Sequence, residues 1–222
     1  MSRILAIETS GALCSVGLDQ DGNRFEVTHH VDRRHNELLL GMIEEVLDQA
    51  GAERSSLTGL AFGCGPGSFT GVRIAAACVQ ALALVNQLPV LPVPSADALA
   101  KAALNSGRVD STKVLITSIR SRAGHFYLAA FRCLETGLET LEEVRLYDSA
   151  QQLPEVMCGD AQLVGVPPDW WPDGNWLDVS ATAGDILDIA IPALQQNLGV
   201  ASAAALPLYV SGDTPWKRVS KS

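Results

Sequence analysis

The stretch 63–73, Gly-Cys-Gly-Pro-Gly-Ser-Phe-Thr-Gly-Val-Arg, is the part of the sequence whose residue types could bind an anion. It lies between an apolar segment typical of a strand and an alanine-rich helix, so N–H groups at the helix N-terminus could hold a phosphate. The stretch has no lysine, however, and it fits neither the P-loop nor the dinucleotide-binding motif. Pro66 and Gly67 suit the centre of a type II turn, and Ser68 or Thr70 can cap the helix. The sequence therefore favours a structural turn over an anion site.

The histidines and cysteines form no recognisable catalytic or metal-binding pattern. His29 and His30 are adjacent on a predicted strand, so they point to opposite faces. His35 is followed by Leu39 where a helical metal site needs a second histidine. The five cysteines are scattered without a C-x-x-C pair, which is typical of reduced thiols. The sequence predicts no metal site and no serine or cysteine protease site.

Length and composition indicate a soluble globular protein. The chain has 222 residues, of which 47% are hydrophobic and 18% charged, enough for one large domain or two lobes. Its net charge of −9 argues against holding nucleic acid alone, because RNA affinity depends on cations that meet phosphates. Glu8 follows only four apolar residues, so no signal-peptide core is expected. We expect a cytoplasmic protein with no membrane association.

Hydrophobic periodicity predicts the elements of the first half of the chain. Alternating or continuous apolar residues indicate strands, and apolar stripes at helical spacing indicate helices. The predicted strands are 4–7, 14–18, 25–31, 57–62 and 90–93, and the predicted helices are 34–50, 69–87 and 95–105. Ser95 is the expected cap of the third helix.

A weaker series of elements follows a break at residues 105–107. The predicted strands are 114–116, 126–131, 141–146 and 162–166, with a short helix from Ser149 and a last helix that begins at a capping box of Thr182 and Asp185. Two βββαβα units in tandem describe the duplicated ribonuclease-H-like architecture of actin, sugar kinases and Hsp70 ATPase domains. We therefore predict a two-lobed actin-like (ASKHA) α/β fold. Its N-terminal lobe would span 1–105, and its smaller, degenerate C-terminal lobe 106–222.

The two predicted lobes differ at the positions where nucleotide hydrolysis would need a matching acidic residue in each. Enzymes of this architecture place an acidic residue on the first hairpin of each lobe, because Mg²⁺ bound to phosphate needs oxygen ligands. The first lobe offers Glu8, but the second offers Arg120. Competent ATP hydrolysis is therefore not expected. Glu8, Thr9 and Ser10 would form at most a vestigial phosphate loop, and the plainer interpretation is that Glu8 hydrogen-bonds its own turn.

Several motifs together carry a resemblance to a known family. They are Ile4-Leu5-Ala6-Ile7-Glu8-Thr9 with Cys14-Ser15-Val16, Arg34-His35 with Leu39-Leu40, residues 63–74 above all, and more faintly Arg122 with Tyr127 and Pro207-Leu208-Tyr209. These motifs resemble the TsaB (YeaZ) family of bacterial tRNA threonylcarbamoyladenosine synthesis. The glycine-rich motif is shared in part with TsaD, the catalytic paralogue.

The resemblance implies a non-catalytic subunit. It would pair with TsaD through the first two helices of the N-terminal lobe, work with the ATPase TsaE, and form a homodimer when TsaD is absent. TsaD would transfer threonylcarbamoyl to the adenosine next to the tRNA anticodon, so this chain would meet tRNA only through the complex. The resemblance implies no cofactor on this chain alone, with ATP and Mg²⁺ in the assembled complex.

The sequence departs from the family pattern at four positions. Glu8 stands where the family usually has aspartate, and Gly41 stands where a proline is common. Arg120 and His125 occupy two positions that are usually acidic. Any family role of those two carboxylates does not carry over to this chain.

The helices 34–50 and 69–87 form the predicted partner surface. The apolar stripe of the first is wider than one sheet face needs and the second is apolar all round, so another subunit is expected to cover them. The predicted interface residues are His35, Leu38, Leu39, Met42, Phe69, Val72, Arg73, Ala75, Ala76 and Val79. We expect Ala75→Arg or Leu39→Glu to abolish partner binding while the lobe stays folded.

Two alternatives compete with the accessory-subunit hypothesis. The first is an active ATPase or kinase of the same architecture, which Mg-ATP binding with turnover would support. The second is a glycoprotease-like metallopeptidase, against which the missing histidine pair argues.

Overall fold

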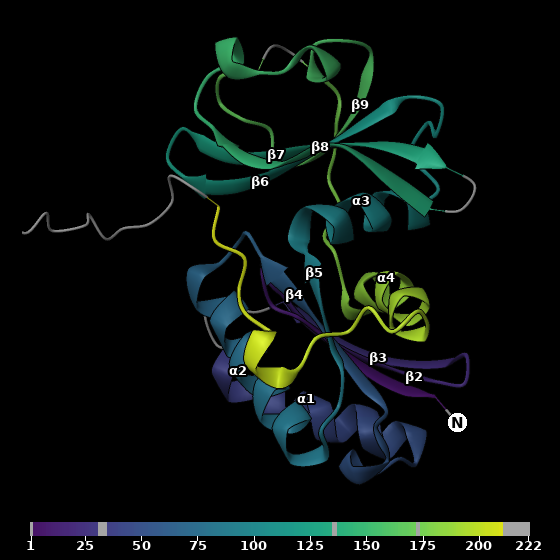
Figure 1. Ribbon diagram of the computed structural model, residues 1–222. Helices are drawn as coiled ribbons and strands as arrows, with labels where there is room; N and C mark the ends of the chain where they lie inside the picture. Colours follow the sequence, from purple (N-terminus) through teal and green to yellow (C-terminus); the bar gives the residue numbers. More distant parts are fainter. Residues whose placement is uncertain (1, 31–34, 135–136, 172–173, 211–222) are drawn as a thin grey trace, which may run out of the picture.

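A computed structural model describes residues 2–30, 35–134, 137–171 and 174–210, which form two lobes, each built on a five-stranded sheet (Figure 1). The first sheet contains β1 (Arg3–Glu8), β2 (Leu13–Gln20), β3 (Asn23–His30), β4 (Gly59–Gly65) and β5 (Val90–Pro94). The second contains β6 (Val114–Arg122), β7 (His125–Leu134), β8 (Gly137–Tyr147), β9 (Ala161–Gly165) and β10 (Trp176–Leu177). The helices are α1 (His35–Ala50), α2 (Phe69–Asn86), α3 (Ser95–Asn105) and α4 (Ala183–Gln195). Short 3-10 helices are η1 (Arg54–Ser56), η2 (Ala150–Gln152), η3 (Glu155–Met157) and η4 (Ser202–Ala204).

The two sheets have the same strand order. It is β3-β2-β1-β4-β5 in the first lobe and β8-β7-β6-β9-β10 in the second. In each sheet the three strands that come first in the chain pair antiparallel. The fourth strand in the chain pairs parallel with the first, and the fifth pairs parallel with the fourth. This repetition confirms the predicted duplicated, two-lobed actin-like fold.

Helices cover the first sheet on both faces (Figure 1). Alternate residues of β1 face opposite sides, so Leu5 and Ile7 join the core under α1 and α2 while Ile4 and Ala6 join the core under α4. Because both faces are covered, β1 reads as a continuous apolar run.

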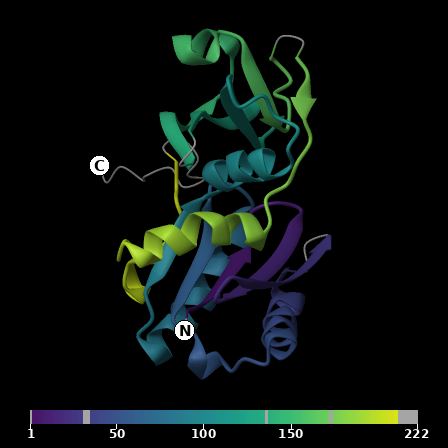
Figure 2. The ribbon, with the colours of Figure 1, turned by 90° about the vertical axis from the view of Figure 1, so that its right-hand side faces the viewer.

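Helix α4 lies in the chain after the second sheet but packs on the first (Figure 2). Its residues Ile186 and Leu187 belong to the same core cluster as Ile4 and Ala6. The predicted division at residue 105 separates the two sheets, but it places this helix in the segment 106–222. In space, the first lobe includes a helix that the chain supplies last.

The second lobe has no counterpart of α1 among its described residues. The chain between β8 and β9 forms only the 3-10 helices η2 and η3. Three tryptophans, Trp170, Trp171 and Trp176, pack instead against the sheet face that includes Phe126, whose ring meets Trp170 edge-on at 6.2 Å. This lobe is therefore covered by loops on the face that two helices cover in the first.

The capping signals were predicted with mixed success. The capping box of α4 is confirmed, because the Thr182 N–H donates to the Asp185 carboxylate at 2.9 Å. The predicted Ser95 cap is wrong: Pro94 occupies the cap position, and Ser95 is the first residue of α3. Ser68 caps α2, since its hydroxyl accepts from the Gly71 N–H at 3.2 Å.

The glycine stretch seats the N-terminus of α2 on the turn between β1 and β2. The predicted type II turn is wrong, because the positive φ lies at Gly65 (+102°) rather than at Gly67. The Gly65–Pro66 peptide bond is cis. Cβ atoms added at Gly67 and Gly71 would lie 2.4 Å from the Ser10 carbonyl oxygen and 1.9 Å from that of Thr9. These two glycines are therefore required by close backbone contact.

This contact predicts that two Gly→Ala substitutions change the free energy of unfolding in opposite directions. Gly71→Ala should lower the free energy of unfolding by about 2 kcal/mol, because the new methyl group forces the Thr9 carbonyl away. Gly41→Ala, in α1 with nothing within 4 Å of its Cβ position, should instead raise the free energy of unfolding by about 0.5–1 kcal/mol. Urea unfolding of both variants tests this, and a stabilised Gly71→Ala variant would contradict it.

Candidate functional site

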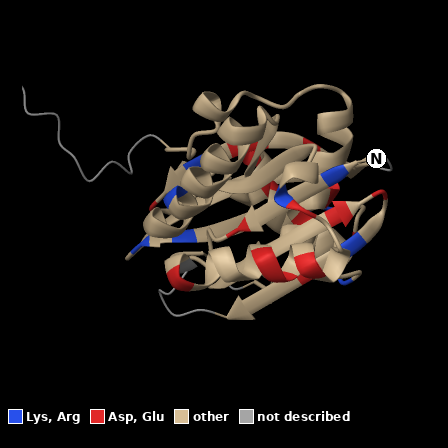
Figure 3. Ribbon diagram, turned by 90° about the horizontal axis from the view of Figure 1, so that it is seen from below, with Lys and Arg blue, Asp and Glu red and all other residues tan. Residues whose placement is uncertain are grey.

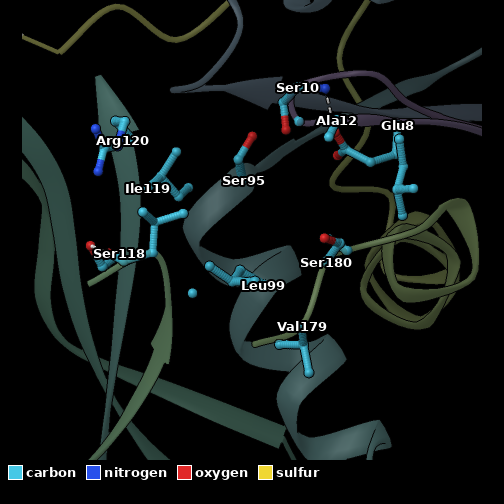
Figure 4. A pocket seen from close by; sticks show the side chains of 15 residues that line it. Glu8, Ser10, Ala12, Ser95, Leu99, Ser118, Ile119, Arg120, Val179 and Ser180 are labelled. Carbon is cyan, nitrogen blue, oxygen red and sulfur yellow. Dashed lines mark hydrogen bonds between the residues drawn. The ribbon is translucent and has the colours of Figure 1, made fainter. Parts of the chain in front are cut away.

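Glu8 lies at the base of the cleft between the lobes (Figure 4). Its side chain is fully buried, one carboxylate oxygen accepts from the Ser10 N–H at 2.5 Å, and the other has no hydrogen-bond partner. A Cβ at Gly63 would lie 1.9 Å from this second oxygen, so glycine there makes room for the carboxyl group. Burial, with a smaller contribution from the nearby Asp185, raises the pKa of Glu8 above 4.5. The expected hydrogen bond to its own turn is present.

Thr9 and Ser10, the other members of the predicted phosphate loop, also form hydrogen bonds within the protein. The Thr9 hydroxyl donates to the Gly71 carbonyl at 2.9 Å, and the Ser10 carbonyl accepts from the Ser68 N–H at 2.7 Å. A phosphate cradle needs free N–H groups at a helix N-terminus. Here the N–H groups of Ser68 and Gly71 already have acceptors within the protein.

The cleft itself is small and mostly apolar. It has a volume of about 190 Å³ and is lined by residues of both lobes, including Leu99, Ile119, Val179, Ser95 and Ser180 (Figure 4). Sites for drug-sized ligands usually measure about 300–1,000 Å³. The cleft in this conformation is thus smaller than most such sites.

Arg120 occupies the position on β6 where a second metal-binding carboxylate would be needed. Its guanidinium reaches Asp169 at 3.4 Å and lies 5.2 Å from the ring centre of Phe126. With a cation on one lobe and the single carboxyl group of Glu8 on the other, Mg²⁺ has no pair of anionic ligands. Within the described ranges, no three histidine, cysteine or acidic side chains come close enough to hold a metal ion.

The cysteines of the first lobe are unsuited to nucleophilic chemistry. Burial raises the pKa of Cys64 to about 12 and those of Cys14 and Cys78 to about 11. At neutral pH these side chains remain thiols, and the thiolate is the reactive form.

The predicted partner surface divides into core and exposed residues. Six of its ten residues have at most 4% of their surface exposed and form the core of the first lobe: Leu39, Met42, Val72, Ala75, Ala76 and Val79. Phe69 and Arg73 are exposed, and Leu38 is half-buried. The side chain of His35 lies outside the described part of the structure.

Burial also contradicts the expectation that Ala75→Arg and Leu39→Glu leave the lobe folded. Ala75 is 0% exposed and Leu39 2% exposed. A charged side chain at either position would be buried without a partner, at a cost of several kcal/mol. Ala75→Arg and Leu39→Glu would therefore disrupt the lobe itself.

The accessible part of α1 and α2 forms an apolar groove of about 360 Å³. Its walls are Asn36, Leu39, Leu40, Ile43, Arg54, Ile74, Ala77, Cys78, Ala81 and Leu82. Helix α2 carries one charged residue, Arg73, whereas α1 carries several acidic residues (Figure 3). None of these acidic residues lines the groove. Leu40, Ala77 and Ala81 were missing from the predicted interface, although Leu40 belongs to the Leu39-Leu40 motif.

Large exposed apolar side chains concentrate on α1, on α2 and on the C-terminal segment beside α2. The described residues expose ten of them, of which Leu40 lies on α1 and Phe69, Leu84 and Val85 lie on α2. Three more, Leu206, Leu208 and Tyr209, lie on the C-terminal strap, which we define as residues 201–209. Seven of the ten thus lie on two helices and one strap, and such clustering marks an interaction surface.

The length and hydropathy of α2 would also suit a membrane span. Six of its residues are buried in the lobe, and its capped N-terminus packs on the turn between β1 and β2. These contacts make α2 a core helix of the first lobe.

Two lobes with matching sheets and a cleft between them define an α/β protein of the actin-like class. A family model described as TsaD, tRNA N6-adenosine threonylcarbamoyltransferase, matches residues 27–159. The chain is 32% identical to the tRNA threonylcarbamoyladenosine biosynthesis protein TsaB of Escherichia coli over 98% of each chain. It is 26% identical to the TsaB of Haemophilus influenzae over 97% of this chain and 96% of that one.

A solved structure agrees with these sequence relatives. YeaZ from Pseudomonas aeruginosa superposes with a TM-score of 0.84 at 30% identity, covering 95% of this chain and 100% of that one. The chain therefore belongs to the TsaB (YeaZ) family of tRNA threonylcarbamoyladenosine biosynthesis proteins.

The buried carboxyl group of Glu8 predicts a pH dependence of stability. Because its pKa is raised in the folded state, the folded state retains a proton that the unfolded state loses above about pH 4.5. Stability from this group is complete below that pH and falls as pH rises through the folded-state pKa. Glu8→Gln keeps an acceptor for the Ser10 N–H and cannot ionise. The free energy of unfolding of the variant, relative to that of the unsubstituted protein, should therefore increase as pH rises from 4 to 8. Urea unfolding at several pH values measures this difference, and a difference that does not change with pH would contradict the prediction.

Proposed function

We propose that this chain is the non-catalytic partner subunit of the machinery that makes threonylcarbamoyladenosine in tRNA. Its role would be to support TsaD, the threonylcarbamoyltransferase, through a helix-bundle heterodimer formed by α1 and α2. The observation that carries the proposal is the gathering of exposed apolar side chains on these helices and the strap beside them.

The match to the TsaD family model supports the choice of partner. It spans residues 27–159 and so includes α1 and α2. A partner of that family would bring an equivalent pair of helices, and related folds can meet through equivalent surfaces in a pseudo-twofold interface. A second copy of this chain could cover the same groove when TsaD is absent.

The cleft supports a non-catalytic role. Glu8 is buried and its pKa is raised, and Arg120 stands where the second carboxylate would be needed. ATP and Mg²⁺ would therefore act elsewhere in an assembled complex that includes the ATPase TsaE. The net charge of −9 supports contact with tRNA only through that complex, which we place in the cytoplasm.

Substitution of exposed groove residues tests the heterodimer. Leu40→Glu or Ala81→Arg should abolish co-purification with TsaD, because each places a charge on the apolar surface that the partner would cover. Both residues are exposed, so the lobe should keep its thermal stability. Leu198→Glu is the matched control, since Leu198 is 60% exposed, like Leu40 at 64%, but lies away from the groove. Undiminished co-purification of both groove variants would refute the heterodimer as proposed.

An assay of the isolated chain separates the accessory subunit from an active ATPase or kinase. Phosphate release from Mg-ATP should stay at the level of a buffer blank, and Glu8→Gln should leave it unchanged. Turnover that Glu8→Gln removes would establish the enzyme alternative.

A further inference from the structure

The C-terminal strap runs antiparallel to α2 along almost its whole length (Figure 1). Ser202 lies beside Ala83 and Leu88 near the end of the helix. Further along, the Ala205 carbonyl accepts from the Gln80 side chain at 2.9 Å. The strap therefore follows the side of α2 that neither the sheet nor α1 covers.

Two contacts hold the tip of the strap at the N-terminus of α2. The Leu208 N–H donates to the Cys64 carbonyl at 2.8 Å, and the Tyr209 hydroxyl accepts from Arg73 Nε at 3.0 Å. Arg73 lies 3.4 Å from the ring centre of Phe69 and 5.6 Å from that of Tyr209. Cation–π contacts of this kind contribute about 0.5–1 kcal/mol each at exposed sites, so Arg73 joins the strap to the helix.

The strap nevertheless leaves its large apolar side chains in solvent. Leu206, Leu208 and Tyr209 are 58%, 36% and 54% exposed. The strap is attached to α2 and β4 by hydrogen bonds of its backbone and of the Tyr209 hydroxyl. The result is an ordered apolar surface, and a surface held in place before binding loses less entropy when a partner covers it.

The exposed surface of the strap is continuous with that of the helix groove. The exposed residues Phe69, Arg73, Ala77 and Ala81 form one stripe along α2 at a spacing of four residues. Arg73 touches the strap, whereas Ala77 and Ala81 line the groove with α1. One stripe of α2 thus connects the two apolar surfaces.

We propose that the strap is the second half of the docking surface and that the subunit covering α1 and α2 also covers Leu206, Leu208 and Tyr209. This inference rests on the proposed function, because it takes the TsaD-family partner as the occupant. Three of the seven clustered apolar side chains lie on the strap, so a partner limited to the two helices would leave them in water.

The experiment compares two exposed leucines of equal accessibility. Leu206 on the strap is 58% exposed, and Leu198, in the turn after α4, is 60% exposed. In calorimetric titration of the full chain with TsaD, Leu206→Glu should raise the dissociation constant by about tenfold or more. Leu198→Glu should bind as the unsubstituted chain does, and both variants should keep the same thermal midpoint.

Each other outcome has a definite meaning. If Leu206→Glu and Tyr209→Ser both bind TsaD normally while Leu40→Glu does not, the strap proposal is overturned and the helix-bundle function stands. If Leu40→Glu also binds normally, both proposals fail. Loss of self-association alone in Leu206→Glu, with TsaD binding intact, would assign the strap to a second copy and overturn the inference. Equal weakening by Leu198→Glu would also overturn it, because the effect would then not depend on position.

Discussion

The structure depends on one constraint: α2 is apolar around its circumference, but a single sheet can bury only one of its sides. Gly71 lets the helix approach the Thr9 carbonyl, and Ala75 and Val79 then pack directly on the sheet. Helix α1 lies beside α2 across the apolar groove, and the C-terminal strap lies along another side. The stripe that remains, between the groove and the strap, is what a partner would have to cover.

The same close packing engages backbone and hydroxyl groups at the edge of the cleft that a phosphate site would need to be free. The turn at Thr9 and Ser10 uses its carbonyl and hydroxyl groups to hold the N-terminus of α2, so its backbone joins elements of the first lobe. Glu8 sits behind that turn, buried and with a raised pKa. In this protein the residues of the fold's usual site hold the lobe together, and exposed apolar surface lies instead on the helices.

Much of the fold could be predicted from the sequence because its signals are local. Periodicity places α1 and α2 within a residue or two, and the repeated order of strands reveals the duplication. The packing of α4 on the first sheet could not be predicted, since it joins residues such as Ile186 and Ile4 that are distant in sequence. For the same reason, periodicity found the apolar residues of α2 but could not separate the buried Ala75 from the exposed Ala77. Nothing local in Leu206 or Leu208 indicates that they lie beside a helix that precedes them by more than a hundred residues.

Hydrogen–deuterium exchange of the free chain and of its mixture with TsaD tests the central claim most directly. The account predicts slower exchange on binding in α1, in α2 and in residues 201–209, with no change in the second sheet from β6 to β10. Protection confined to the second lobe or to the residues of the inter-lobe cleft would contradict it.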